Sequence, residues 1–186
     1  MTGRTVPVGR LSLPRGETVS IVPLDGVEAT DLARLGAGLE QTGLAVTVSA
    51  PAELPPSAYD RARGQFRAER LLELARGLEG RRILAVTARD LYAYGLNFVF
   101  GIAESPGRAA VVSLARLRGG ADDATFCARA VKEAVHELGH TLGLVHCADP
   151  LCVMHFSNSL ADTDRKTSNL CAACLRRARG SGRSRP

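Results

Sequence analysis

The sequence has no apolar run long enough to cross a membrane as a helix, which takes about 20 consecutive apolar residues. Its first ten residues include two arginines but no apolar core of the kind that marks a secretory signal peptide. We therefore expect a cytoplasmic protein with no membrane partner. Cysteines remain reduced in that compartment, so the five cysteines are expected to be free or metal-bound.

Acidic residues are missing from the C-terminal end. The formal net charge is +5, and five of the arginines lie in the last eleven residues: Arg176, Arg177, Arg179, Arg183 and Arg185. The remaining 19 basic residues balance the 19 acidic ones. The basic character thus belongs to a tail rich in Gly, Ser and Arg, residues 175–186, which we expect to be disordered. Attraction to a phosphate backbone is the alternative, but we do not expect nucleic acid as a partner.

Histidine is also scarce, yet three of the four histidines fall between residues 136 and 146. His136 and His140 are four residues apart, so on a helix both imidazoles leave the same face. Two neutral imidazoles there can bind one Zn²⁺ at about 2.0–2.1 Å, and a catalytic zinc needs a third ligand. His146 supplies it if the helix ends first, and Gly143 can adopt the left-handed conformation that ends a helix.

Glu137 directly follows the first of these ligands. It is rotated away from the metal but close enough to reach a zinc-bound water, whose pKa the metal lowers towards ~7. As general base, Glu137 would take the proton of this water and pass it to the leaving amine of a peptide. The pattern therefore predicts a zinc-dependent peptide hydrolase. The alternative is a helix with three coincidental histidines.

Four cysteines follow in two pairs, Cys147 with Cys152 and Cys171 with Cys174. Two such pairs are typical of a Cys₄ structural zinc site, and two disulfides are the competing interpretation. We therefore expect two Zn²⁺ per chain, one catalytic and one structural. Cys127 lies nine residues before the first histidine of the motif, and we interpret it as a small core residue.

The spacing H-E-x-x-H-x-x-G-x-x-H is the metzincin signature, and Met154, eight residues after His146, can form the methionine turn of that clan. Together with the cysteines, this run resembles the archaemetzincin family, metzincin-type zinc peptidases with a second, tetracysteine zinc. Further matches to the family pattern are Phe156-Ser157-Asn158-Ser159, Thr163-Asp164 and Lys166. The match is dense from about residue 98 to residue 174. Sixteen residues separate Met154 from Cys171, one fewer than in the family pattern, and a loop tolerates that deletion.

The resemblance implies a peptide or protein substrate and leaves open whether the enzyme is an aminopeptidase or an endopeptidase. In metzincins the fourth strand is an antiparallel edge strand beside the active-site cleft. Carried over to residues 97–103, this implies that an extended peptide pairs with the strand. The residues concerned are Asn97, Phe98, Val99, Phe100 and Gly101. The resemblance also implies that Met154 packs under the imidazoles without binding the metal.

Some metzincins have a tyrosine after this methionine that assists the oxyanion. The present sequence has none there, so another donor or the zinc alone must serve. A zinc-stabilised protein- or nucleic-acid-binding module with a vestigial peptidase site is the alternative function. Glu137 favours the enzyme, because binding alone needs no base beside the ligands.

Apolar runs alternate with helical periodicity up to residue 143, which predicts an α/β fold of the metzincin α+β kind. Predicted strands cover residues 18–24, 44–49, 82–87, 97–103 and 109–114. Predicted helices lie between residues 25 and 43, over 57–78, and from 122 to 143. The link over 104–108 permits a hairpin, so one of its two strands runs antiparallel. We expect a twisted, mixed five-stranded sheet with an antiparallel edge strand, flanked by helices.

The length suits one domain, and we expect a monomer. Residues 1–174 form the predicted metallopeptidase domain, with an upper lobe over about 15–143. A lower, irregular, Cys-rich lobe over about 144–174 is too short and polar to build its own core, so its zinc must stabilise it. The fourth histidine, His155, is expected at the surface beside the methionine turn.

Overall fold

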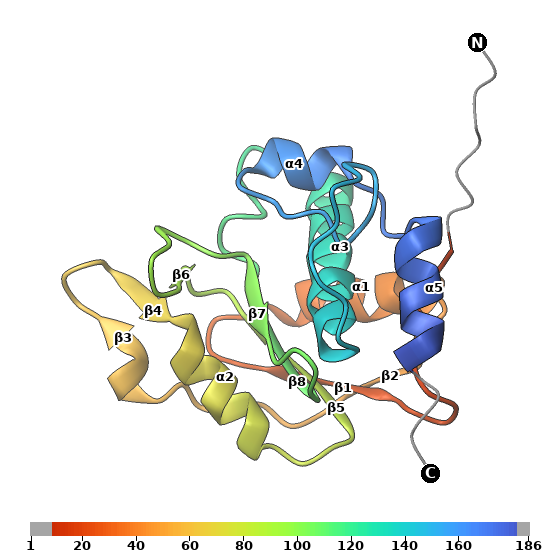
Figure 1. The fold of residues 1–186 in the computed structure, drawn as a ribbon. Coiled ribbons are helices and arrows are strands. Elements are labelled where there is room, and N and C mark those ends of the chain that lie inside the picture. Colours follow the sequence, from red (N-terminus) through yellow and green to blue (C-terminus); the bar gives the residue numbers. More distant parts are fainter. Residues whose placement is uncertain (1–8, 182–186) are drawn as a thin grey trace.

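The computed structural model describes residues 9–181 (Figure 1). Its main sheet has five strands in the order β2-β1-β5-β8-β7. Four of them run parallel, and β7 at the edge runs antiparallel to β8. The strands are β1 Val19–Pro23, β2 Val46–Val48, β5 Arg82–Thr87, β7 Gly101–Ala103 and β8 Ala109–Ser113. The predicted mixed sheet with its antiparallel edge strand is confirmed.

Helices cover both faces of this sheet (Figure 1). Helices α1 (Ala29–Gln41) and α3 (Asp123–Thr141) pack on one face, and α2 (Ala68–Gly77) packs on the other. Because successive residues of a strand point to opposite faces, β5 contributes Leu84 to the first core and Ile83 to the second. A parallel strand buried on both faces needs a continuous apolar run, as β5 and β8 have.

The single helix predicted over residues 57–78 is wrong for its first half. This stretch forms the 3₁₀ turn η1 (Pro56–Ala58), the hairpin strands β3 (Tyr59–Asp60) and β4 (Gln65–Arg67), and only then α2. Strand β4 also pairs with β6 (Leu91–Tyr92), which makes a second, three-stranded sheet. Tertiary contacts of Gln65 stabilise the strand β4 in place of a helix: its Nε2 donates to Asp90 Oδ2 at 3.0 Å and to the Asn97 carbonyl at 3.1 Å. Helical periodicity does not encode such contacts.

The predicted strand over residues 97–103 is shorter in the structure. Only Gly101–Ala103 belongs to β7, and Val99 makes a single bridge to Leu91 of the second sheet. The Asn97 carbonyl accepts hydrogen bonds from Gln65 and from Arg63 Nη2, the latter at 3.0 Å. Residues 97–100 are therefore held by the β3–β4 hairpin and form a rim that leads into β7.

Helix α3 begins and ends as predicted. The Asp122 carboxylate caps its first turn by accepting from the Thr125 amide at 2.8 Å, and Gly143 just beyond its end has φ +80°. In α1, Gly38 faces Val131 of α3 so closely that a Cβ would collide with the valine. This glycine lowers the helix propensity of α1 but lets the two helices approach each other.

After α3 the chain forms loops and two further helices, α4 (Leu160–Arg165) and α5 (Ala172–Ser181). The predicted disordered tail is therefore wrong for residues 175–181, and residues 182–186 lie outside the described residues. The many arginines of this segment make it look disordered in the sequence, but Leu175 and Ala178 lie on one face of α5 and pack against the core. No helix within residues 9–181 is long and apolar enough to span a membrane.

Candidate metal centre and active-site cleft

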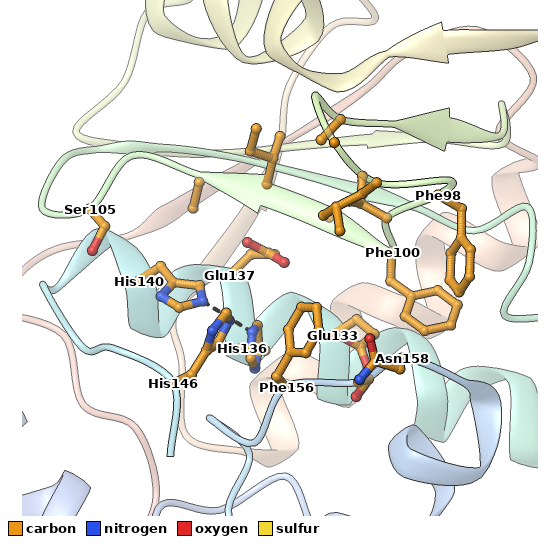
Figure 2. A pocket seen from close by; sticks show the side chains of 18 of the residues that line it. Phe98, Phe100, Ser105, Glu133, His136, Glu137, His140, His146, Phe156 and Asn158 are labelled. Carbon is orange, nitrogen blue, oxygen red and sulfur yellow. Dashed lines mark hydrogen bonds between the residues drawn. The ribbon is translucent and has the colours of Figure 1, made fainter. Parts of the chain in front are cut away.

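Three histidines converge at the C-terminal end of α3 (Figure 2). The Nε2 atoms of His136 and His140 are 3.1 Å apart, and one ring nitrogen from each of the three residues lies within 4.8 Å of the others. The turn at Gly143 brings His146 back, so that its ring centroid lies 5.4 Å from that of His136 and 4.9 Å from that of His140. The structure thus assembles the histidines that the sequence selected.

Backbone carbonyls set the proton positions of these rings. Nδ1 of His136 donates to the Val153 carbonyl and Nδ1 of His140 donates to the Leu144 carbonyl, each at 2.7 Å. Both Nε2 atoms therefore present lone pairs to each other, an arrangement that favours a cation between them. Nitrogens bound to one tetrahedral zinc at about 2.0–2.1 Å lie about 3.3 Å apart, so the 3.1 Å separation fits zinc.

Burial keeps the three imidazoles in the state that binds metal. It lowers the pKa of His136 well below its usual range and lowers that of His140. His146 is the most exposed of the three, and its partial burial lowers its pKa as well. The positive charge of Lys166 acts in the same direction on each of them. Neutral rings result, and these are the ones that coordinate zinc.

Glu137 extends from α3 towards the edge strand β7 (Figure 2). It is buried, and a Cβ atom built on Gly101 of β7 would lie 2.6 Å from both Cγ and Oε1 of Glu137. Burial raises the pKa of Glu137 well above that of an ordinary glutamate, repulsion from Glu133 adds to this, and Lys166 opposes it. The sequence marked Gly101 as part of the edge strand, but this close approach to Glu137 was not foreseen.

Met154 packs directly beneath α3. Position 139 is a glycine, and a Cβ there would collide with the Met154 sulfur. The Met154 carbonyl accepts from the Cys147 amide at 2.9 Å, which closes the turn below the histidines. The small residue inside the H-E-x-x-H run therefore has a packing role: it makes room for the methionine.

A cavity of about 520 Å³ runs between β7 and α3, past the three histidines. Its upper wall includes all five residues predicted for the substrate strand: Asn97, Phe98, Val99, Phe100 and Gly101. Its lower wall is formed by Phe156, Ser157 and Asn158. The rings of Phe98 and Phe100 meet edge to face at 5.2 Å, and the Phe156 ring lies 4.8 Å from that of His146.

A buried ion pair stands at one end of this cavity, and sequence reasoning did not assign it a role. Lys166 Nζ lies 3.0 Å from Glu133 Oε1, and the two side chains are 0% and 3% exposed. Lys166 also donates to the His155 carbonyl at 3.4 Å, which links α3 to the methionine turn. A signal for Glu133 was present, because it precedes Glu137 by four residues and so shares its helix face. Lys166 is one of only two lysines in the chain.

The four paired cysteines also meet. Their Sγ atoms lie within 4.8 Å of one another, and the five cysteines of the chain are free thiols, not disulfides. Cys147 and Cys171 have their sulfurs 3.7 Å apart, where zinc bound by thiolates at about 2.3 Å would place them about 3.8 Å apart. Burial raises the pKa of Cys152 to about 11, so a bound cation is needed to keep it a thiolate at neutral pH.

The two remaining candidates lie outside these clusters. Cys127 is half-buried against the core, with its sulfur 3.6 Å from the Arg34 carbonyl. His155 is also half-buried, and its Nδ1 donates to the Cys147 carbonyl at 2.9 Å. Neither contributes an atom to the histidine group or to the cysteine group.

Comparison with known proteins places this geometry among characterised families. Residues 44–179 match the sequence profile of peptidase family M54. The archaemetzincin of Methanopyrus kandleri is 54% identical over 125 residues, 66% of this chain and 71% of that protein. The archaemetzincin of Pyrococcus furiosus is 39% identical over 176 residues, 87% of this chain and 92% of that protein.

Solved structures show the same likeness. The crystal structure of the Methanopyrus kandleri archaemetzincin superposes with a TM-score of 0.81 at 44% identity, and the match covers 91% of this chain and 98% of that chain. The Archaeoglobus fulgidus archaemetzincin, crystallised in complex with malonate, gives a TM-score of 0.79 at 38% identity over 86% and 99% of the two chains.

Proposed function

The chain belongs to peptidase family M54, the archaemetzincins, which are zinc metallopeptidases, and on that premise we propose that Glu137 is its general base. In this proposal His136, His140 and His146 hold the catalytic zinc. The observation that carries it is the pair of Nε2 atoms on His136 and His140, which face each other, with Glu137 next to His136 on the same turn of α3. A binding module would need no buried carboxylate at this position.

The residues of the cleft divide the chemical work. When bound, zinc would polarise the substrate carbonyl and lower the pKa of a water molecule. The Val153 and Leu144 carbonyls fix the rings of His136 and His140, so their Nε2 atoms stay directed at one point. Glu137 accepts a proton from the attacking water at its carboxylate and delivers that proton to the nitrogen of the leaving amine. Its raised pKa helps it to hold the proton between the two steps.

The position of strand β7 is evidence that the substrate is an extended peptide. It is the last strand of its sheet, so only one of its edges pairs with β8 and the other borders the cleft. A peptide added to that free edge would run past the histidines with alternate side chains directed into the cavity. This geometry supports a protein or peptide as the substrate, as membership of a peptidase family implies.

The second zinc, in this proposal, is structural and is held by Cys147, Cys152, Cys171 and Cys174. It would fix the loops after α3, where Leu170 and Val153 continue the buried cluster of the sheet. Because β1 and Cys174 belong to the same buried cluster, we propose one metallopeptidase domain. We propose in addition that it acts as a monomer.

The test is the turnover of a mixed peptide library by wild type and by Glu137→Gln at matched zinc content. Gln keeps the shape of the side chain but cannot take the proton, so hydrolysis should fall by about 10²- to 10⁴-fold while zinc remains bound. Glu40→Gln, on the exposed side of α1, is the control and should leave turnover unchanged. Equal rates for wild type and Glu137→Gln would refute the role of Glu137.

A further inference from the structure

The cavity continues beyond the histidines towards the N-terminal part of α3 (Figure 2). There its walls are the rings of Phe98 and Phe100 from the rim and of Phe156 from the lower loop. Glu133 stands at the end, beside Asn158. One helical turn, about 5.4 Å, separates Glu133 from Glu137. A side chain of a substrate residue next to the cleaved bond can therefore reach it.

The two carboxylate oxygens of Glu133 differ in their partners. Oε1 accepts from Thr163 Oγ1 at 2.7 Å, from Lys166 Nζ at 3.0 Å and from Ser157 Oγ at 3.4 Å. Oε2 accepts no hydrogen bond from residues 9–181. Within residues 9–181, the side-chain oxygen that is both fully enclosed and without a hydrogen-bond partner is Oε2 of Glu69. Oε2 of Glu133 has no partner either but is not fully enclosed, so it is exposed to the cavity that Glu133 lines. The cavity thus ends in a free anionic acceptor.

Lys166 determines which donor suits that acceptor. It is fully buried and already neutralises Glu133. A substrate lysine or arginine would bring a second cation close to Lys166 in a site of low dielectric, where like charges repel strongly. The end of the cavity therefore favours a donor without charge.

We propose that Glu133 is a specificity-determining residue whose Oε2 accepts a hydrogen bond from a substrate tyrosine. Tyrosine combines an aromatic body, which packs edge to face on phenylalanine rings, with a neutral hydroxyl donor at its tip. Phenylalanine would fill the same walls but leave Oε2 desolvated and without a donor. This inference rests on the proposed peptidase function and names the substrate class of the same site.

The first test compares peptides that differ only in Tyr, Phe or Lys at each position next to the cleaved bond. At one position kcat/KM should be about 10- to 100-fold higher for Tyr than for Phe, as expected for one hydrogen bond to a charged acceptor. Lys should rank below Phe there. Equal values for Tyr and Phe, or a preference for Lys, would overturn the inference.

The second test removes the acceptor and its counterion together. In Glu133→Leu/Lys166→Met the ion pair becomes apolar, a replacement that buried pairs often tolerate. The Tyr-to-Phe ratio of kcat/KM should fall to about one or below, whereas general damage to the site would lower both values and leave the ratio unchanged. A ratio that stays at the wild-type value would overturn the inference. If this double variant does not fold, the Tyr-to-Phe ratio of kcat/KM in the wild type alone decides whether the inference holds.

Glu17→Leu/Arg82→Met is the matched control. It removes another largely buried ion pair, whose Arg82 contacts Thr141, the last residue of α3. Its Tyr-to-Phe ratio should equal that of the wild type.

Calorimetric binding of the same Tyr and Phe peptides to the zinc-loaded wild type separates this inference from the proposed function. Tighter binding of Tyr without hydrolysis would support the specificity and overturn the peptidase proposal. Hydrolysis without a preference for Tyr would support the peptidase proposal and overturn the proposed specificity. Absence of both binding and hydrolysis would overturn both.

Discussion

Gly101 of β7 and Glu137 of α3 lie so close that the glycine hydrogen occupies the space any side chain would need. A Cβ at position 101 would stand 2.6 Å from Cγ and Oε1 of Glu137 and 2.6 Å from the Val111 carbonyl of β8. Strand β8 is held between β5 and β7, so the Val111 carbonyl cannot yield, and both β7 and the Glu137 side chain would have to shift. The position of the proposed base is thus set by the absence of a side chain opposite it.

Gly101→Ala should therefore impair turnover without loss of metal. Displacement of a catalytic group by about 1 Å can cost about 10²-fold in rate, and we expect kcat/KM to fall by about that factor. Gly77→Ala is the control, because a Cβ there meets no heavy atom within 4 Å; it should retain full activity. The measurements are peptide turnover and zinc content, and normal turnover in Gly101→Ala would contradict the proposed position of the base.

The two ligand sets should respond differently to substitution. His140→Ala should remove one zinc and abolish hydrolysis while the fold persists, because the sheet and helices do not depend on that metal. Cys152→Ser should remove a zinc and also lower the melting temperature, because the loops after α3 rely on it. Elemental analysis and thermal unfolding check both variants. Identical melting of the two would show that the division into catalytic and structural metals is wrong.

Lys166→Met should destabilise the protein strongly. It leaves the Glu133 carboxylate buried beside Thr163 without its cation, and breaking a buried pair typically costs about 3–5 kcal/mol in the free energy of unfolding. Adding Glu133→Leu should recover most of this loss. Urea denaturation at matched zinc content measures the free energy of unfolding of both single variants and of the double variant. Strictly additive effects of the two substitutions would contradict the coupling of Lys166 to Glu133.

The ion pair between Arg129 and Asp164 should make stability depend on pH. Hydrogen bonds from the Arg129 guanidinium lower the pKa of Asp164, against the opposing effect of burial. Because the folded pKa lies below the unfolded value of about 3.9, this contribution is fully present above pH 4 and is lost as pH falls through the folded pKa. Asp164 is 44% exposed, so solvent screening limits its contribution to about 1 kcal/mol.

Asp164→Asn should accordingly lower the free energy of unfolding by about that amount at pH 6. The difference from the wild type should shrink below pH 4. Urea denaturation at several pH values provides the comparison, and a difference that stays constant down to pH 3 would argue against the assignment.

The sequence predicted well what depends on spacing or on a continuous apolar run. His136, His140 and His146 meet as their spacing requires, and the four paired cysteines meet as well. Strands β1, β5 and β8 coincide with their apolar runs, because a strand buried on both faces can hardly be built otherwise. The histidine run and each strand are local features, and each cysteine pair is recognised by its own short spacing, so one sequence was sufficient.

The errors and omissions all involve contacts between distant segments. The apolar residues of the β3–β4 hairpin recur with helical periodicity, but Gln65 in this hairpin is hydrogen-bonded to Asp90, which lies 25 residues further along the chain. Residues 175–181 look disordered by composition, yet Leu175 packs back on Gly9 near the start of the described chain. The role of Glu133 depends on Lys166, which lies 33 residues further on and is brought back by α4.

The order of these parts along the chain has a consequence for biogenesis. Within residues 9–181 every strand lies before residue 114, and every proposed metal ligand lies after residue 135. Ribosomes release a chain from its N-terminus, so the sheet emerges before the first ligand histidine. Zinc capture is then a late event on an existing scaffold. A nascent chain arrested before residue 136 would contain both sheets but none of the seven ligand side chains.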